Sequence, residues 1–291
     1  QRGIALKTHD KKQRGRGCLT ALIVIALIAA ICAFLIKDSS QTLEISRYEV
    51  ASEKLSESFD GFRIVQLSDL HGAQFGDDGT ELVDKVRSLS PDIIALTGDF
   101  VTDEGDLEAV EKLAPRLTEL CPVYFVSGNH EFGSGLAQRV RSILESAGVK
   151  YLSNEYLTIS RGSDSVLLGG VEDPIAYADM LAPDELAQKM NEAAPAAFKI
   201  LLGHRNYWMK EYPELPVDLI LSGHAHGGIV RIPGVGGLIG TDRHLFPDFV
   251  EGKFYNGNYT MIVSRGLGNS VPIPRIFNRP EIVCVTLKAE K

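Results

Sequence analysis

Alternation of short apolar runs with amphipathic stretches limits the fold of this chain more than any other feature. Three apolar runs have the composition of strands: 62–69, 91–99 and 122–130. Stretches with apolar residues at helical spacing follow them: 82–89, 106–118 and 134–147. Because strands separated by helices form βαβ units, the first half of the chain predicts an α/β fold with a parallel sheet.

The second half of the chain has a different pattern, with one clear helix near 183–193 and several short apolar runs. This change indicates a second, more mixed sheet that packs on the first. No linker divides residues 44–291 into independent domains. The expected strands of the second half are 156–160, 165–171, 198–203, 217–222, 259–264 and 281–287.

A long apolar segment precedes this body of the chain. Residues 18–36 form a run of 19 residues without a charge, in which Thr20 is the one polar side chain. As a helix the run would be about 28 Å long, which matches the hydrocarbon thickness of a bilayer. A cleaved signal peptide is the alternative, but its apolar region is usually ~7–15 residues and ends in an A-x-A-like site. We therefore predict an uncleaved transmembrane anchor.

The charges around this segment predict its orientation. Residues 1–17 carry six basic side chains and one acidic one, whereas the remaining 274 residues carry 24 basic and 37 acidic ones. The positive-inside rule then places the N-terminus in the cytoplasm and the large domain outside the cell membrane. Such an acidic body makes nucleic acid an unlikely partner. The predicted organisation is a basic cytoplasmic tail (1–17), a transmembrane anchor (18–36), a tether (37–43) and one catalytic domain (44–291).

Polar side chains follow five of the predicted strands, at the point where each strand ends. Ligands of open α/β sheets bind at the carboxyl ends of the strands, so we expect these side chains to share one edge. Each alone has an ordinary explanation as a helix cap, a turn residue or a packed histidine. Five of the seven histidines, however, lie in these positions. The strand-end residues are Asp69, His71, Asp99, Asn129, His130, His204, His224 and His226.

A metal centre explains this coincidence. Imidazole nitrogen combined with carboxylate and amide oxygen suits divalent Mn, Fe, Zn or Co. A thiolate site is not expected, because neither Cys121 nor Cys284 lies in a motif. Even seven of these eight side chains would be too many ligands for one tetrahedral ion. They suit two ions, which can together clamp a transferring phosphoryl group.

The motifs D-x-H, GD, GNHE, GH and GHxH, in this order over roughly residues 60–230, resemble those of the calcineurin-like metallophosphoesterases. The tail 264–287 is similar to the membrane-anchored bacterial branch of that family, the YkuE-type and YaeI-type phosphodiesterases. The resemblance implies a four-layer αββα sandwich of two mixed sheets, here preceded by one N-terminal transmembrane helix.

The resemblance also assigns roles to the strand-end residues. It implies that Asp99 bridges two divalent metal ions and that a metal-bound hydroxide is the nucleophile. It implies that His130 binds no metal but contacts the phosphate and protonates the leaving group. The implied ligands are Asp69, His71 and His226 for the first ion, and Asn129, His204 and His224 for the second.

These features predict a membrane-anchored phosphoesterase that hydrolyses a phosphodiester or diphosphate bond. The anchor favours a substrate linked to a lipid or to the cell wall. A hydrolase of UDP-2,3-diacylglucosamine-type lipid diphosphates is one alternative. A metal-binding scaffold without catalysis is an alternative of another class, although scaffolds on this fold typically lose ligands that are all present here.

Further polar residues near the motifs have two interpretations each. Glu131 either tunes the neighbouring His130 or caps a helix, and Asp173 is expected to be a turn residue. The apolar loop 271–277 (VPIPRIF) either packs or faces lipid. Three arginines of the tail are candidates for contacting phosphate: Arg265, Arg275 and Arg279.

Overall fold

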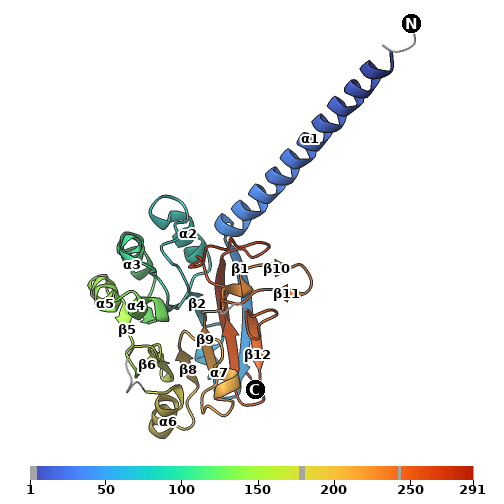
Figure 1. The fold of residues 1–291 in the computed structure, drawn as a ribbon. Coiled ribbons are helices and arrows are strands. Elements are labelled where there is room, and N and C mark those ends of the chain that lie inside the picture. Colours follow the sequence, from blue (N-terminus) through green and yellow to red (C-terminus); the bar gives the residue numbers. More distant parts are fainter. Residues whose placement is uncertain (1–4, 177–180, 242–243, 291) are drawn as a thin grey trace.

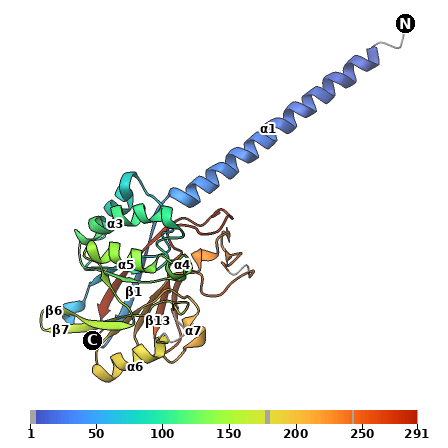
Figure 2. The same cartoon turned by 60° about the vertical axis from the view of Figure 1, so that its left-hand side comes forward.

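The computed structural model describes residues 5–176, 181–241 and 244–290, with side chains from Leu19 onward. Two six-stranded sheets pack face to face, and helices cover the outer face of each (Figure 1, Figure 2). This four-layer arrangement confirms the predicted αββα sandwich of two mixed sheets.

The first sheet contains the parallel strands β2, β3, β4 and β5. Strand β14 lies between β1 and β2, parallel to β1 and antiparallel to β2. The prediction that 281–287 belongs to the second sheet is therefore wrong: the first residues of β14 are buried on both faces, as an interior strand requires. In sheet order the strands are β1 (Glu44–Ser52), β14 (Glu281–Ala289), β2 (Arg63–Leu67), β3 (Ile93–Thr97), β4 (Val123–Val126) and β5 (Lys150–Tyr151).

The second sheet has a parallel centre and antiparallel edges. Strands β13, β9, β8 and β7 run parallel, and β12 and β6 pair antiparallel at the two sides. A separate short hairpin, β10 (Arg231–Ile232) with β11 (Gly236–Gly237), follows β9 along the chain. In sheet order the strands are β12 (Gly252–Tyr255), β13 (Thr260–Val263), β9 (Leu219–Ser222), β8 (Lys199–Leu202), β7 (Asp164–Gly170) and β6 (Glu155–Arg161).

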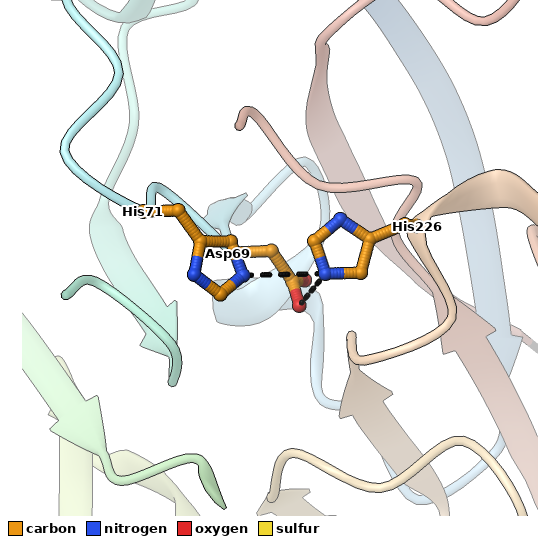
Figure 3. A group of neighbouring side chains, drawn as sticks. All are labelled: Asp69, His71 and His226. Atoms are coloured by element: carbon orange, nitrogen blue, oxygen red, sulfur yellow. Dashed lines mark hydrogen bonds and ion pairs between the residues drawn. The ribbon is translucent and has the colours of Figure 1, made fainter. Parts of the chain in front are cut away.

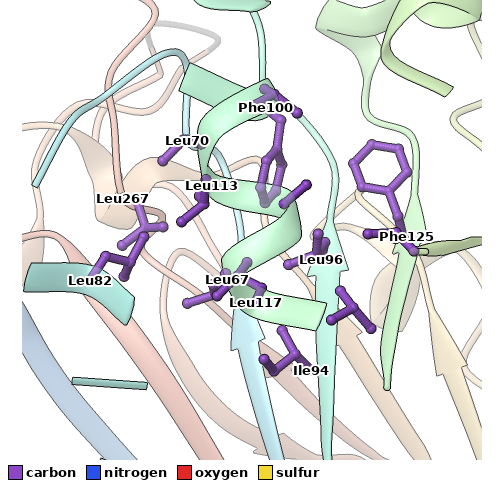
Figure 4. Packing of buried hydrophobic residues seen from close by; sticks show 14 of the residues in the cluster. Leu67, Leu70, Leu82, Ile94, Leu96, Phe100, Leu113, Leu117, Phe125 and Leu267 are labelled. Atoms are coloured by element: carbon purple, nitrogen blue, oxygen red, sulfur yellow. The ribbon is translucent and has the colours of Figure 1, made fainter. Parts of the chain in front are cut away.

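Amphipathic helices bury their apolar faces on the sheets. In α3, buried residues recur at helical spacing, and Leu113 and Leu117 pack over Leu67 and Leu96 of the first sheet (Figure 4). Each fully buried leucine contributes about 1.5–3 kcal/mol. The helices are α2 (Thr80–Ser88), α3 (Leu107–Thr118) and α5 (Ala137–Ser146) on the first sheet, α6 (Pro183–Ala193) and α7 (Trp208–Glu211) on the second, and the short α4 (Asn129–Gly133). Single 3-10 turns are η1 (Glu57–Phe59), η2 (Asp77–Gly79), η3 (Glu104–Asp106) and η4 (His226–Gly228).

One long helix, α1 (Ala5–Gln41), extends away from the domain. Its part Leu19–Gln41 is long and apolar enough to cross a membrane, and its most apolar window is not buried against the domain. This part contains nearly all of the predicted anchor. Of the predicted tail 1–17, residues 1–4 lie outside the described residues, and the backbone of the rest continues the helix.

The segment 37–43, predicted as a polar tether, is mostly helical. Contacts with the domain account for this difference. The Arg279 guanidinium donates to Asp38 at 2.9 and 3.0 Å, and the backbone N–H of Asn278 donates to Ser39 Oγ at 3.4 Å. The last turn of α1 is thus held against the loop that precedes β14.

The anchor joins the domain at the edge where the central strands end. Glu44, the first residue of β1, pairs with Glu281 of β14, and Gln66 near the end of β2 pairs with Val283. Since β1 runs opposite to β2, β3 and β4, the carboxyl ends of these three strands lie beside the end of α1. The topology therefore places the predicted metal edge next to the anchor.

Candidate metal centre

The predicted ligands follow the strands as expected, and their backbone is unusual. Five of the seven have positive φ: Asp69 (52°), His71 (45°), Asp99 (57°), His224 (70°) and His226 (48°). Left-handed backbone at residues other than glycine is disfavoured and gathers at functional sites. The strand ends thus turn sharply, so that side chains from β2, β3 and β9 point toward one another.

A first group of side chains consists of Asp69, His71 and His226, whose potential ligand atoms all lie within 4.8 Å of one another. The two imidazoles face each other with 3.2 Å between their Nε2 atoms, and His226 Nε2 lies 3.4 Å from Asp69 Oδ1 (Figure 3). All three side chains are buried. This is the set predicted for the first ion.

A second group consists of Asp99, His204 and His224. His204 Nε2 lies 3.0 Å from Asp99 Oδ2 and 3.2 Å from His224 Nδ1. Asp99 also approaches the first group, because its Oδ2 is 3.8 Å from His71 Nε2. The carboxylate of Asp99 therefore stands between the two groups, where a bridging ligand is predicted.

The outer nitrogens of three histidines contact oxygen atoms of the domain. His71 Nδ1 lies 2.8 Å from Thr102 Oγ1, and His204 Nδ1 lies 2.8 Å from the Thr97 carbonyl oxygen. His226 Nδ1 lies 3.4 Å from the carbonyl oxygen of Gly268. A proton held on Nδ1 leaves the Nε2 lone pair directed into the centre. Such outer contacts are typical of metal-binding histidines.

Asn129 provides the clearest sign that the centre fits a cation. This residue begins α4, and its buried Oδ1 has no hydrogen-bond partner among the described residues. An unpaired amide oxygen in the interior costs about 1–3 kcal/mol unless another group satisfies it. This oxygen could coordinate a divalent ion, so the set of donor atoms suits the ions that the sequence predicts.

Burial and mutual repulsion keep most of the histidines neutral. Burial, with the neighbouring His226, lowers the pKa of His71 well below its usual value, and burial, with His204 and Arg205, lowers the pKa of His224 to about 2. His204 behaves oppositely: burial lowers its pKa, but the Asp99 carboxylate outweighs this effect and raises it to about 10. Neutral imidazoles can coordinate metal ions without first losing a proton.

Two glycines allow the close packing of the centre. A Cβ on Gly223 would lie 2.0 Å from Ser68 Oγ, and a Cβ on Gly203 would lie 1.9 Å from the ring of Trp208. A side chain at either position would displace the strand end that carries a candidate ligand. Trp208 is buried at 2% exposure, and its ring packs against Gly203.

His130 lies at the open side of the centre. It is half-buried, and its ring approaches the His71 ring edge-on with 4.8 Å between centroids. Its backbone N–H donates to Asp99 Oδ1 at 2.8 Å, which ties the start of α4 to the carboxylate. The imidazole thus borders both groups of candidate ligands, as a residue that contacts the phosphate would.

Glu131 caps the short helix α4, one of its two predicted roles, because its carboxylate accepts the backbone N–H of the N-cap residue Gly128. Its carboxylate is fully buried and accepts backbone N–H groups of Asp99 (3.0 Å), Phe100 (2.6 Å) and Gly128 (2.8 Å). Burial, with the nearby Asp99 charge, raises the pKa of Glu131 to about 7. Glu131 therefore fixes the left-handed turn that carries Asp99.

We expect the substitution Glu131→Gln to weaken metal binding about 10–100-fold, because an amide NH₂ would oppose the backbone donors around Asp99. Calorimetric titration of the metal-free full chain with Mn²⁺ measures this loss. Glu104→Gln, at an exposed carboxylate paired with Arg139, is the matched control and should leave the affinity unchanged. Equal Mn²⁺ affinity of the two variants would show that Glu131 does not position Asp99.

Arg205, which the sequence analysis did not single out, lies directly beside the centre. Its guanidinium donates to both carboxylate oxygens of Asp173 at 2.6 and 2.9 Å, and its Nη1 lies 3.1 Å from His224 Nε2. Asp173 is thus a buried ion-pair partner and more than the expected turn residue. Arg205 directly follows the strand-end histidine His204, and this position was the sequence signal that could have identified it.

The three tail arginines predicted as phosphate contacts serve the structure instead. Arg265 approaches Glu44, Glu251 and Glu281 within 3.4 Å, and Arg279 pairs with Asp38. Arg275 is buried and donates to the backbone carbonyl groups of Gly268, Asn278 and Arg265. Asp103, Glu104 and Asp106 lie at the start of a helix: Asp103 caps η3, which leads into α3.

A pocket of about 630 Å³ adjoins the second group of ligands. Its lining includes the half-buried Arg205 and His224 and the exposed Leu245 and Phe246. Arg205, Lys210 and the polar His244 favour an anion, and the aromatic side chains favour an apolar substituent. The pocket can thus hold a substrate group attached to a phosphate at the centre.

Comparisons with known proteins find several metallophosphoesterases among the relatives of this chain. An uncharacterized metallophosphoesterase of Aquifex aeolicus (strain VF5) is 32% identical over 260 residues, which cover 85% of this chain and 93% of that protein. YkuE, an uncharacterized metallophosphoesterase of Bacillus subtilis (strain 168), is 28% identical over 254 residues, 85% of this chain and 86% of its own. A Danio rerio transmembrane protein with a metallophosphoesterase domain is 28% identical over 300 residues, 94% of this chain and 63% of its own. The model of the calcineurin-like phosphoesterase family matches residues 62–228, and the chain therefore belongs to that family.

Proposed function

We propose that this family member hydrolyses a phosphodiester or diphosphate bond at two divalent metal ions. One observation carries the proposal: two His/Asp groups meet at the carboxylate of Asp99, beside the unpaired buried oxygen of Asn129. Family membership implies a metal-dependent phosphoester hydrolase, and the donor set of these groups supports two ions over one.

Asp69, His71 and His226 would hold one ion, and Asn129, His204 and His224 the other, with Asp99 shared between them. Bound there, the ions would offset the negative charge of the phosphate and lower the pKa of a water molecule. Their identity is open among Mn, Fe, Zn and Co.

The remaining roles fall to two side chains at the rim. A ring nitrogen of His130 would donate a proton to the oxygen of the leaving group, which otherwise departs as an unfavourable alkoxide. The Arg205 guanidinium, held by Asp173, would orient the phosphoryl group through charge-assisted hydrogen bonds.

The pocket supports a phosphate ester with a sizeable substituent. Its volume of about 630 Å³ is well beyond the space that a phosphate alone requires, and its lining includes Arg205 and His224 as well as Leu245 and Phe246. A substituent on the phosphate would fill this space and gain binding energy there. The choice of a diester or diphosphate over a monoester rests on the resemblance to the YkuE-type and YaeI-type phosphodiesterases.

The decisive experiment is metal analysis of the purified full chain together with hydrolysis of two p-nitrophenyl substrates. We expect about two divalent ions per chain, and faster hydrolysis of bis-p-nitrophenyl phosphate than of p-nitrophenyl phosphate. Strong preference for the monoester would reverse the assignment. A chain that binds ions and hydrolyses neither substrate would instead support the scaffold alternative.

We further propose that α1 anchors the chain in the cell membrane, with its N-terminus in the cytoplasm and the domain outside. The apolar span Leu19–Gln41 and the six basic residues before it support this orientation. Protease added to intact cells should then degrade the domain. Full protection in intact cells, with degradation after lysis, would place the domain inside.

A further inference from the structure

Three loops near the metal centre form one hydrogen-bonded surface, which we call the loop layer (229–241, 244–249 and 269–279). The Arg231 N–H donates to the Ile276 carbonyl at 2.9 Å, the Leu238 N–H to Val230 at 2.7 Å, and the Phe246 N–H to Leu238 at 3.0 Å. These bonds join all three segments into one continuous surface.

The loop layer exposes an unusual share of the domain's apolar side chains. Outside α1, nine large apolar side chains are exposed among the described residues, and six of them lie in this layer. A cluster of this kind on a soluble surface marks an interaction site. The six are Ile232 (38% exposed), Val235 (66%), Leu245 (66%), Phe246 (59%), Ile273 (38%) and Phe277 (49%).

The one charged residue between Ile273 and Phe277 turns away from this surface. The guanidinium of Arg275 is buried beneath the loop and donates to backbone carbonyl groups, while its neighbours Ile273 and Phe277 are exposed. The segment 232–236 (IPGVG) contains no charged residue. Both loop tips are thus apolar, which suits contact with hydrocarbon rather than water.

The end of α1 is attached to the same layer. Asn278 and Arg279 of the layer hold Ser39 and Asp38 in the last turn of α1. Figure 1 shows β10 and β11 on the side of the domain from which α1 extends. A bilayer that contains the span Leu19–Gln41 therefore has its surface at the level of these loops.

We propose that the loop layer dips into the bilayer that α1 spans, and that the metal centre takes its phosphoester or diphosphate substrate from that bilayer. The substrate class is an amphiphile with a phosphate headgroup and an apolar tail. This assignment of substrate rests on the proposed hydrolase function, whereas the bilayer contact stands on the layer and α1 alone.

The pocket connects the two parts of the proposal. Its lining includes Arg205 and His224, which lie at the second group of candidate ligands, and Leu245 and Phe246, which belong to the exposed apolar set. A lipid could thus place its phosphate at the centre while its tail stays on apolar surface. Complete extraction of the tail into water, which costs about 0.8 kcal/mol per CH₂ group, would be avoided.

Quenching of an added tryptophan tests the bilayer contact directly. The full chain carries one native tryptophan, the buried Trp208, so a second tryptophan adds a separable signal. We compare Val235→Trp with Tyr255→Trp in nanodiscs of phosphatidylcholine with and without brominated acyl chains. Tyr255 is matched in exposure (68% against 66%), but pairs with Thr260 at the start of β13, at the opposite end of the sheet from His224.

We expect the tryptophan at 235 to lose about half of its added fluorescence, because interfacial side chains lie about 5–10 Å deep. The tryptophan at 255 should lose none. Equal quenching at both positions, or none at 235, would overturn the bilayer contact. If a second copy of the chain covered this surface instead, the fluorescence of the tryptophan at 235 would change with the number of chains per nanodisc. Bromination of the acyl chains would then have no effect on it.

Hydrolysis of a lipid-borne ester tests the substrate class. The probe is the p-nitrophenyl ester of dioleoyl phosphatidic acid in the same nanodiscs, and bis-p-nitrophenyl phosphate is the soluble counterpart. Val235 does not line the pocket, so Val235→Asp should lower lipid-ester hydrolysis about tenfold and leave the soluble diester unchanged. Tyr255→Asp should change neither rate.

The outcomes separate the two proposals. Hydrolysis of the soluble diester without hydrolysis of the lipid ester would overturn the lipid substrate and keep the hydrolase. Equal loss on both substrates in Val235→Asp would also overturn it. If neither substrate is hydrolysed, the hydrolase proposal fails, while the quenching result still decides the bilayer contact.

Discussion

The substitution Asp99→Ala is expected to remove both ions and to lower phosphodiester hydrolysis about 10³-fold or more. Its carboxylate lies 3.0 Å from His204 Nε2 and 3.8 Å from His71 Nε2, so it faces both groups of candidate ligands. Elemental analysis of the purified variant measures the loss of metal, and bis-p-nitrophenyl phosphate measures the loss of activity.

Asp103→Ala is the matched control for this experiment. It removes a carboxylate four residues further along, which caps η3 and contacts no candidate ligand. Loss of a helix cap lowers the free energy of unfolding by about 1 kcal/mol. The control therefore also shows how local destabilisation near the centre changes its metal content. Normal metal content in Asp99→Ala would contradict the shared position of this carboxylate.

The second large effect is expected from His130→Ala, which should keep its metal and lower kcat about 10²–10⁴-fold. The half-buried imidazole lies 4.8 Å from the His71 ring and close enough to share an ion with His71 and Asp99, but it belongs to neither predicted ligand set. Elemental analysis and steady-state kinetics on a diester with a poor leaving group together measure this behaviour.

The leaving group distinguishes a proton donor from a structural residue. A p-nitrophenolate leaving group needs little protonation, so the loss in His130→Ala should shrink on bis-p-nitrophenyl phosphate. Added imidazole should restore part of the rate on the poor leaving group. A loss that is equal on both substrates, or that comes with loss of metal, would remove the role of proton donor.

Local pattern made most elements of the fold predictable. Periodicity located the helices α2, α3, α5 and α6 and the strands β2, β3 and β4, because these elements bury a regular set of apolar residues. The place of β14 was not predictable, since strand order depends on contacts between distant segments. Strands β10 and β11 were not predicted, because a strand of two residues leaves no periodic pattern in the sequence.

The predicted metal ligands could be found from the sequence because the end of a strand fixes where its side chain points. The roles of Glu131, Arg205 and Asp173 depend instead on tertiary burial. Glu131 follows His130 directly, yet its carboxylate turns inward to the backbone of Asp99. Which of several acidic residues becomes buried is decided by the packing of α4 on the sheet, which sequence spacing does not encode.

The left-handed backbone at five candidate ligands links metal supply to the lifetime of the protein. Each such conformation costs on the order of 1 kcal/mol, so the unliganded domain gives up a noticeable part of its folding free energy. Ions that bind only the native state would stabilise the folded domain by mass action and so offset this cost. Cells starved of the right divalent ion would therefore lose the protein itself to proteolysis, in addition to losing its activity.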